Sequence, residues 1–295
     1  MSSPCTFLGT ERKLEEARYV VLGVPFDVTS TFRRGARFAP SAIREASLNI
    51  ETFSFKSGIY LDNSLIHDLG DLHVSSSIRE TLKRLELVMN ELLNLGKVPI
   101  IIGGEHTISF AAVKALKDQD ISRINGGLAV VSFDAHLDLR DEFMGLKLCH
   151  ATFMRRLIEE VKPLLIEIGV RAACREEINY AERKGVKVIT TEEIRNEGID
   201  ESEEKIKNFL EESDLIYLSI DMDVLDPGFA PAVQNPEPGG ISTVMLHELL
   251  WRICDGRVIS FDVVEVTPHY DNGITSIVAA KTICEIICYI RSKAK

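Results

Sequence analysis

The sequence predicts an α/β protein with a mostly parallel, eight-stranded sheet, and two observations carry that prediction. Short apolar runs rich in Val and Ile recur along the chain, as expected for strands that are covered by helices on both faces. Amphipathic patterns lie between these runs, as in the segment 78–95, where apolar residues recur at three- and four-residue steps. Such β/α units can close into a barrel or remain an open, doubly wound sheet, and both forms place active sites at the carboxyl ends of the strands.

The eight predicted strands follow one another along the chain. They span residues 19–23, 64–69, 98–102, 128–133, 164–169, 186–190, 215–220 and 258–264. The last helical segment, 274–290, is apolar nearly all round, so we expect either a buried terminal helix or an oligomer contact. Since no linker or break in composition separates two halves, we expect one domain over residues 1–295.

The composition is ordinary for a soluble protein and disfavours two classes of partner. No run approaches the roughly 20 apolar residues of a membrane helix, and no signal-peptide pattern opens the chain, so we expect a cytoplasmic protein without a membrane partner. The net charge of −11 argues against nucleic acid and favours a small cationic ligand. The six cysteines lack CxxC spacing and are expected to be core thiols, with zinc ligands or a disulfide as alternatives.

Acidic and histidine residues gather where the predicted strands end. The residues that follow three of the strands are His106, then Asp134, His136 and Asp138, then Asp221 and Asp223. The stretch VSFDAHLDLRD places Asp134, His136 and Asp138 at every second position, which is one face of a continuing strand. One such pair can be a helix cap or a turn. Four carboxylates in one crevice repel one another and resist desolvation, so together they call for cations.

The donor set indicates the kind of metal and the kind of reaction. Four aspartates and two histidines contain no thiolate, which disfavours structural zinc and suits a harder divalent ion such as manganese, with cobalt or nickel as alternatives. Six ligands are too many for one catalytic ion with an open position and suit two ions that share carboxylates. Because a two-metal centre can generate hydroxide at neutral pH, we expect metal-assisted hydrolysis.

These motifs resemble the ureohydrolase family of arginases and agmatinases, and most of all the agmatinases. The matching blocks are GGEH at 103–106, SFDAHLD at 132–138, SIDMDVLDP at 219–227 and FDVVEVTP at 261–268. The amino-terminal block at 23–47 and PEPGGIS at 236–242 are also similar to the family. The resemblance implies an open architecture, a three-layer α/β/α sandwich around an eight-stranded, mostly parallel sheet. It also implies two Mn²⁺ ions per subunit and a homotrimer or homohexamer.

The resemblance further implies a division of the ligands between two ions. One part of the cluster would be His106, Asp134, Asp138 and Asp223, and the rest would be Asp134, His136, Asp221 and Asp223. The implied reaction is hydrolysis of a guanidinium group to an amine and urea, with a metal-bridging hydroxide as the nucleophile.

Three residues have catalytic roles in the implied scheme. Glu265 matches the glutamate that clamps the guanidinium, and a carboxylate fork suits that planar cation. Asp138 would pass a proton to the leaving amine. His150 matches a histidine that shuttles protons, and it would also contact the substrate.

Differences from the arginases point to agmatine, which would yield putrescine and urea. Arginases hold the amino acid end of arginine through an Asn and a Ser in the loop after the DAHxD block. Here Arg140 stands near the Asn position, and no serine precedes His150. Asn235 replaces a threonine that binds guanidinium or urea in relatives, so Arg140 and Asn235 are candidate substrate contacts. The alternatives are aminopropylagmatine, guanidinobutyrate or arginine as the substrate, or an inactive metal-binding scaffold.

Overall fold

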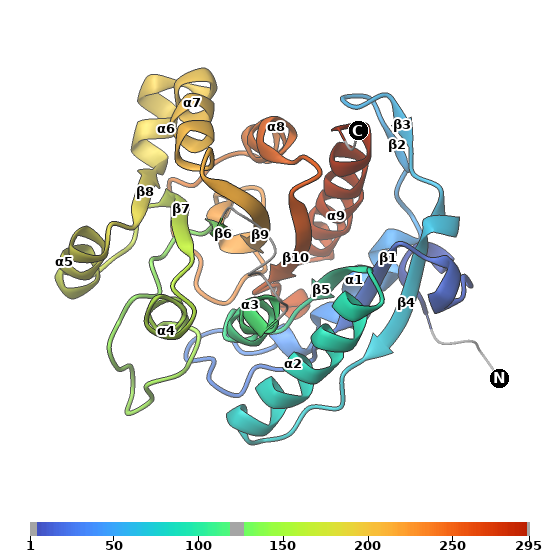
Figure 1. Ribbon diagram of the computed structural model, residues 1–295, viewed down its shortest axis with the longest axis horizontal. Helices are drawn as coiled ribbons and strands as arrows, with labels where there is room; N and C mark the ends of the chain where they lie inside the picture. Colours follow the sequence, from blue (N-terminus) through green and yellow to red (C-terminus); the bar gives the residue numbers. More distant parts are fainter. Residues whose placement is uncertain (1–4, 119–126, 294–295) are drawn as a thin grey trace.

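An eight-stranded sheet organises the computed structural model, which describes residues 5–118 and 127–293 (Figure 1). Its strands are β1 (Tyr19–Gly23), β4 (Ile66–Asp71), β5 (Val98–Ile102), β6 (Gly127–Phe133), β7 (Leu164–Val170), β8 (Lys187–Thr190), β9 (Ser213–Asp221) and β10 (Val258–Val264). The spatial order is β4-β1-β5-β10-β9-β6-β7-β8, and every neighbouring pair is parallel. Because β4 and β8 stand at opposite edges, the sheet is open, and the implied open architecture is confirmed.

Helices cover both faces of this sheet and make the three layers. One face carries α2 (Ile78–Asn94), α3 (Ile108–Asp118), α4 (Phe153–Glu160) and α5 (Arg175–Lys184). The other carries α1 (Ala39–Ser47), α6 (Thr191–Glu197), α7 (Ile199–Phe209), α8 (Thr243–Ile253) and α9 (Ile274–Lys293). Strand side chains alternate between two apolar clusters, one under each set of helices, so the inner strands are buried on both faces, whereas the edge strands β4 and β8 are partly exposed. A small antiparallel hairpin, β2 (Phe53–Ser54) and β3 (Ile59–Tyr60), lies beside α9 (Figure 1).

The terminal helix α9 is buried along most of its length, which confirms the first of the two expectations for this segment. Its thiols Cys284 and Cys288 are buried and free, as are Cys149 and Cys254, whereas Cys5 is exposed and Cys174 is partly exposed. The expectation of core thiols therefore holds for four of the six cysteines. Among the described residues, no helix is both long enough and apolar enough to cross a membrane.

A buried ion pair ties α1 to the edge strand β4. The Arg44 guanidinium donates to Asp68 Oδ2 at 2.8 Å and to Asp71 Oδ1 at 2.5 Å. The Arg44 and Asp68 side chains are only 6% and 1% exposed. This pairing explains why a strand with the polar sequence IHDLGD belongs to the sheet, although the apolar pattern placed it two residues earlier.

Candidate metal centre

The loop after β6 carries the opening motif of the candidate site. The strand ends at Phe133, and Asp134 and Asp138 lie in irregular backbone beyond it. The expectation of one continuing strand face is therefore wrong, although the side chains still converge. Asp134 Oδ1 accepts the His136 backbone N–H at 2.7 Å, which bends the chain, and Asp138 has a φ of 51°. A non-glycine residue with positive φ is uncommon and tends to mark a functional constraint.

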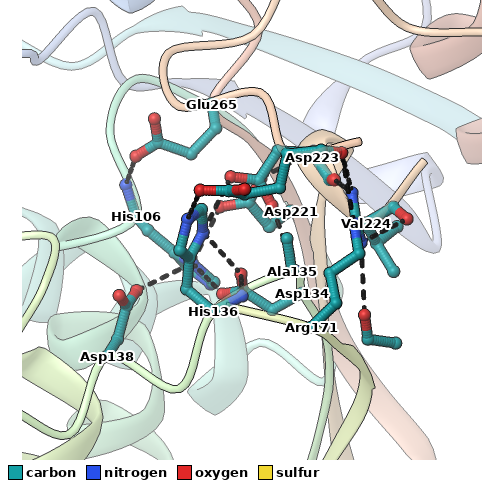
Figure 2. Close-up of polar contacts among 12 residues, drawn as sticks. His106, Asp134, Ala135, His136, Asp138, Arg171, Asp221, Asp223, Val224 and Glu265 are labelled. Atoms are coloured by element: carbon teal, nitrogen blue, oxygen red, sulfur yellow. Dashed lines mark hydrogen bonds and ion pairs between the residues drawn. The ribbon is translucent and has the colours of Figure 1, made fainter. Parts of the chain in front are cut away.

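The GGEH turn after β5 sets the orientation of His106. Gly104 lies against the backbone of Phe26, where a Cβ atom would stand 2.0 Å from the Phe26 carbonyl oxygen. The His106 backbone N–H donates to Glu265 Oε1 at 2.6 Å, and the ring atom Nε2 lies 2.8 Å from Ser219 Oγ. Because Nε2 has this partner, Nδ1 is the ring nitrogen that faces the aspartates (Figure 2).

Six side chains gather around two centres (Figure 2). At the first, His106 Nδ1 lies 3.0 Å from Asp134 Oδ2, 3.1 Å from Asp221 Oδ2 and 3.5 Å from Asp138 Oδ2. At the second, His136 Nδ1 lies 3.1 Å from Asp223 Oδ2 and 3.5 Å from Asp134 Oδ1. The grouping differs from the expected division in one respect, because Asp221 and not Asp223 lies beside His106.

The carboxylates of the cluster repel one another and one histidine nitrogen lacks a hydrogen bond, which suits the binding of divalent cations. His106 Nδ1 is buried and makes no hydrogen bond to any described residue, although three carboxylate oxygens lie within 3.5 Å of it. Burial raises the pKa of Asp138 and of Asp221, and the negative charge of neighbouring aspartates raises both further. Burial alone would lower the pKa of His106, but contacts with Asp134 and Asp221 raise it. A cation between these groups would relieve the repulsion and satisfy the orphan nitrogen.

A cavity of about 320 Å³ opens beside the cluster. Its lining includes all of the predicted substrate contacts, Arg140, His150, Asn235 and Glu265, together with His136, Asp138, Asp221 and Asp223. His106 and Asp134 lie behind this wall and do not line the cavity. The site residues predicted from the sequence therefore lie together at the carboxyl ends of the central strands.

Glu265 is poised to accept hydrogen bonds from a ligand. It follows β10 with a φ of 68°, and its side chain is buried. Oε1 accepts the His106 backbone N–H, whereas Oε2 has no partner among the described residues. Burial raises the pKa of Glu265 to about 8, a value that a cationic ligand would lower.

His150 is buried, whereas the Arg140 side chain is 38% exposed and has two contacts. Burial, followed by the charges of His136 and His106, lowers the pKa of His150 to about 4. The Arg140 guanidinium lies over the Phe143 ring at 5.0 Å and 3.7 Å from the Glu177 carboxylate.

Asp262, in the FDVVEVTP block, lies within β10 and deeper than the cluster. Its carboxylate accepts hydrogen bonds from Ser219, Tyr217 and Ser109 within the sheet layer, at 2.5–2.7 Å. Asp262 therefore orients the hydroxyl of Ser219, which is the partner of His106 Nε2, and it does not line the cavity.

Sequence reasoning missed Arg171 and Glu237. The Arg171 guanidinium donates to five backbone carbonyls, among them those of Asp223 and Glu237, and so fixes the loop that carries Asp223 (Figure 2). Glu237 lines the cavity with an exposed carboxylate, 3.9 Å from His136 Nε2. The only local signal for Arg171 is a cation directly after a buried strand.

Comparisons with known proteins extend the likeness over nearly the whole chain. The model of the arginase family matches residues 17–288. The agmatinase of Pyrococcus horikoshii is 34% identical over 277 residues, which cover 93% of this chain and 92% of that protein. The guanidinobutyrase of Pseudomonas aeruginosa is 32% identical over 278 residues, which cover 91% and 85%. The crystal structure of agmatine ureohydrolase from Thermoplasma volcanium superposes with a TM-score of 0.88 at 37% identity, covering 99% of this chain and 96% of that one.

Proposed function

The chain belongs to the arginase family and is a hydrolase of amidine carbon–nitrogen bonds, and we propose that its substrate is agmatine, which it converts to putrescine and urea. The names of the Pyrococcus and Thermoplasma relatives support this substrate. The geometry of the cavity supports it independently through the charges along its wall.

The observation that carries the agmatine proposal is the set of carboxylates left free in the cavity. Two divalent ions would balance the four aspartates of the cluster, and Glu177 faces Arg140 at 3.7 Å. Two lining carboxylates then stay unbalanced, Glu265 beside the cluster and Glu237 with an exposed carboxylate. Agmatine has a guanidinium at one end and an ammonium at the other, so its two charges match this arrangement.

We propose that two divalent ions, manganese in the cell, are held by His106, Asp134, His136, Asp138, Asp221 and Asp223. The family depends on a binuclear metal centre, and the oxygen and nitrogen donors suit manganese. When bound, such a pair of ions supplies a hydroxide nucleophile at neutral pH and stabilises charge that develops on the reacting carbon's substituents.

The side chains around the cluster would hold the guanidinium and move protons. Glu265 Oε2, which is buried without a partner, would accept N–H groups from the planar cation and fix its orientation. Asp138 would deliver a proton to the leaving amine, since its carboxylate lies at the cavity wall beside the cluster. His150 would exchange protons with the cavity, and the Asn235 amide would contact the urea product.

A second candidate substrate is guanidinobutyrate, and Arg140 is the observation that favours it. Its guanidinium lines the cavity and would attract a distal carboxylate. The pairing of Arg140 with Glu177 and Phe143 reduces that attraction. We therefore rank agmatine first.

Urea release from a panel of guanidino compounds tests the proposal. The purified, manganese-loaded protein is expected to release urea from agmatine much faster than from arginine, guanidinobutyrate or aminopropylagmatine. Equal or higher rates with arginine would contradict the agmatine assignment, and a preference for guanidinobutyrate would favour the second candidate. Absence of urea with every compound would indicate a metal-binding scaffold.

The proposal extends to the organisation of the protein. We propose one domain over residues 1–295, which the continuous sheet and the extent of the family match support. We also propose a cytoplasmic homotrimer or homohexamer, for which light scattering of the purified protein is the direct test.

A further inference from the structure

His150 lies between two threonines of the loop that leads from β1 to α1. Its ring atom Nδ1 is 3.2 Å from Thr29 Oγ1, and its ring atom Nε2 is 3.4 Å from Thr31 Oγ1. Thr29 is buried, whereas Thr31 is exposed and lines the cavity. The two ring nitrogens therefore have different surroundings. Nδ1 faces the protein interior, and Nε2 faces the cavity.

Glu105 fixes the hydrogen of the Thr29 hydroxyl. The Glu105 carboxylate is fully buried, and its Oε1 accepts from Thr29 Oγ1 at 2.5 Å and from Thr107 Oγ1 at 2.6 Å. Oε2 accepts the Thr29 backbone N–H at 2.7 Å. The carboxylate thus grips Thr29 through both its backbone and its side chain, which holds the loop against the GGEH turn.

A hydroxyl has one hydrogen and two lone pairs, so its partners are limited. Because the hydrogen of Thr29 Oγ1 points to Glu105, the oxygen offers only lone pairs to its other neighbours. Its remaining neighbours are the His150 backbone N–H and Nδ1 of the same residue, both at 3.2 Å, and Thr107 Oγ1 at 3.3 Å. The Thr107 hydroxyl directs its own hydrogen to Glu105 Oε1, so it leaves Nδ1 as the group that must donate to Thr29. Nδ1 must then carry a hydrogen, because two lone pairs would otherwise face each other at a buried site.

We propose that Thr29 and Glu105 are positioning residues that hold His150 in the Nδ1–H tautomer, with Nε2 as the atom that exchanges protons with the cavity. In such an arrangement, a hydrogen-bond acceptor beside one ring nitrogen fixes the tautomer of the histidine and leaves the other ring nitrogen to transfer protons. Thr29 acts through His150 and touches neither substrate nor the metal ligands. The kinetic consequences rest on the proposed function, whereas the tautomer does not depend on it.

A spectroscopic experiment tests the tautomer directly. Long-range ¹H–¹⁵N correlation spectra of protein with ¹⁵N-labelled histidine distinguish the protonated from the unprotonated ring nitrogen. The protein is loaded with diamagnetic Mg²⁺, and the signals of His150 are assigned from their absence in His150→Asn. In the wild type we expect a protonated Nδ1 and an unprotonated Nε2. Thr29→Val keeps the shape of the side chain and removes its hydroxyl, so we expect a mixture of the two tautomers in this variant. A protonated Nε2 and bare Nδ1 in the wild type would overturn the proposal.

Steady-state kinetics on the manganese-loaded protein test the consequence. Thr29→Val is expected to lower kcat for urea release about 10- to 100-fold with a KM near that of the wild type. Thr29→Ser, which keeps the hydroxyl, is expected to restore most of the rate. In a His150→Asn background, Thr29→Val is expected to change kcat by less than about threefold, because the residue through which it acts is gone.

Two kinetic outcomes would contradict the role of Thr29. One is an equal loss in both backgrounds, which would mean that Thr29 acts through the fold, and the other is no rescue by serine. If no compound of the panel yields urea, the proposed function fails, while the spectra still decide the tautomer.

Discussion

Replacing Gly104 by alanine would disturb the turn that presents His106. A Cβ atom at this position would lie 2.0 Å from the Phe26 carbonyl oxygen, and real Cβ atoms essentially never approach closer than 3.0 Å. The two segments must therefore separate by about 1 Å. The Glu105 N–H now donates to this same oxygen at 2.7 Å, and a bond lengthened by about 1 Å is no longer a hydrogen bond.

The expected cost combines overpacking with one lost hydrogen bond. Overpacking costs about 1–3 kcal/mol and a buried hydrogen bond contributes about 1 kcal/mol, so unfolding should become easier by about 2–4 kcal/mol. Calorimetry should then show a Tm lower by roughly 3–7 °C, since the unfolding entropy of a chain of this size is about 0.6 kcal/mol/K. Because a misplacement of about 1 Å can cost roughly 100-fold in rate, kcat for urea release should fall by a similar factor.

Gly127→Ala is the matched control, because the nearest atom to a Cβ there is the Leu164 side chain at 4.0 Å. Its Tm and kcat should stay near those of the wild type. If Gly104→Ala behaved like Gly127→Ala, the reasoning about the close approach to Phe26 would be refuted.

Four further predictions follow from the same contacts. Arg44→Met should destabilise the fold by about 3–5 kcal/mol in urea denaturation, because it leaves the buried Asp68 charge without its partner, and an effect below about 1 kcal/mol would refute this reasoning. Burial lowers the pKa of His247 from 6.5, so the unfolded chain takes up its proton first as the pH falls. The contribution of His247 to stability should therefore be present above pH 6.5 and decline below it, and His247→Gln, which retains a donor for Thr282, should make unfolding less sensitive to pH between 5 and 7. Glu237→Gln should raise KM for agmatine several-fold with little change in kcat, whereas an unchanged KM would remove Glu237 from the substrate site. Dialysis against a chelator should abolish urea release, and added Mn²⁺ should restore it; activity that persists without metal would contradict the two-ion scheme.

The sheet could be predicted from the sequence because its strands are apolar on both faces. The runs at 19–23, 98–102 and 258–264 have the predicted bounds in the structure. The edge strand β4 differs most, since its polar residues Asp68 and Asp71 are stabilised by Arg44, which lies 24 residues or more away. Apolar periodicity carries no information about such a pair.

The metal-binding cluster could be predicted in composition but not in local geometry. Residues at the ends of parallel strands converge, which brings Asp134, Asp221 and His106 together. Strand alternation did not predict that Asp138 needs a positive φ beyond the end of β6. The loop reaches the cluster through backbone turns that an alternating pattern cannot describe.

The supporting contacts could not be predicted because their partners are distant in the sequence. Thr29 meets Glu105 across 76 residues and His150 across 121. The partners of Arg171 are backbone carbonyls, which leave no trace in side-chain identity. Only the folded chain reveals what orients the predicted site residues.

The number of bound ions per chain tests the central claim most directly. Elemental analysis of the purified, manganese-loaded protein should give two ions per chain. Asp134→Ala and Asp221→Ala, which each remove a ligand on the first centre, should lose metal while circular dichroism shows a folded chain. Retention of two ions in both folded variants would contradict the assignment of this cluster as the two-ion hydrolytic centre.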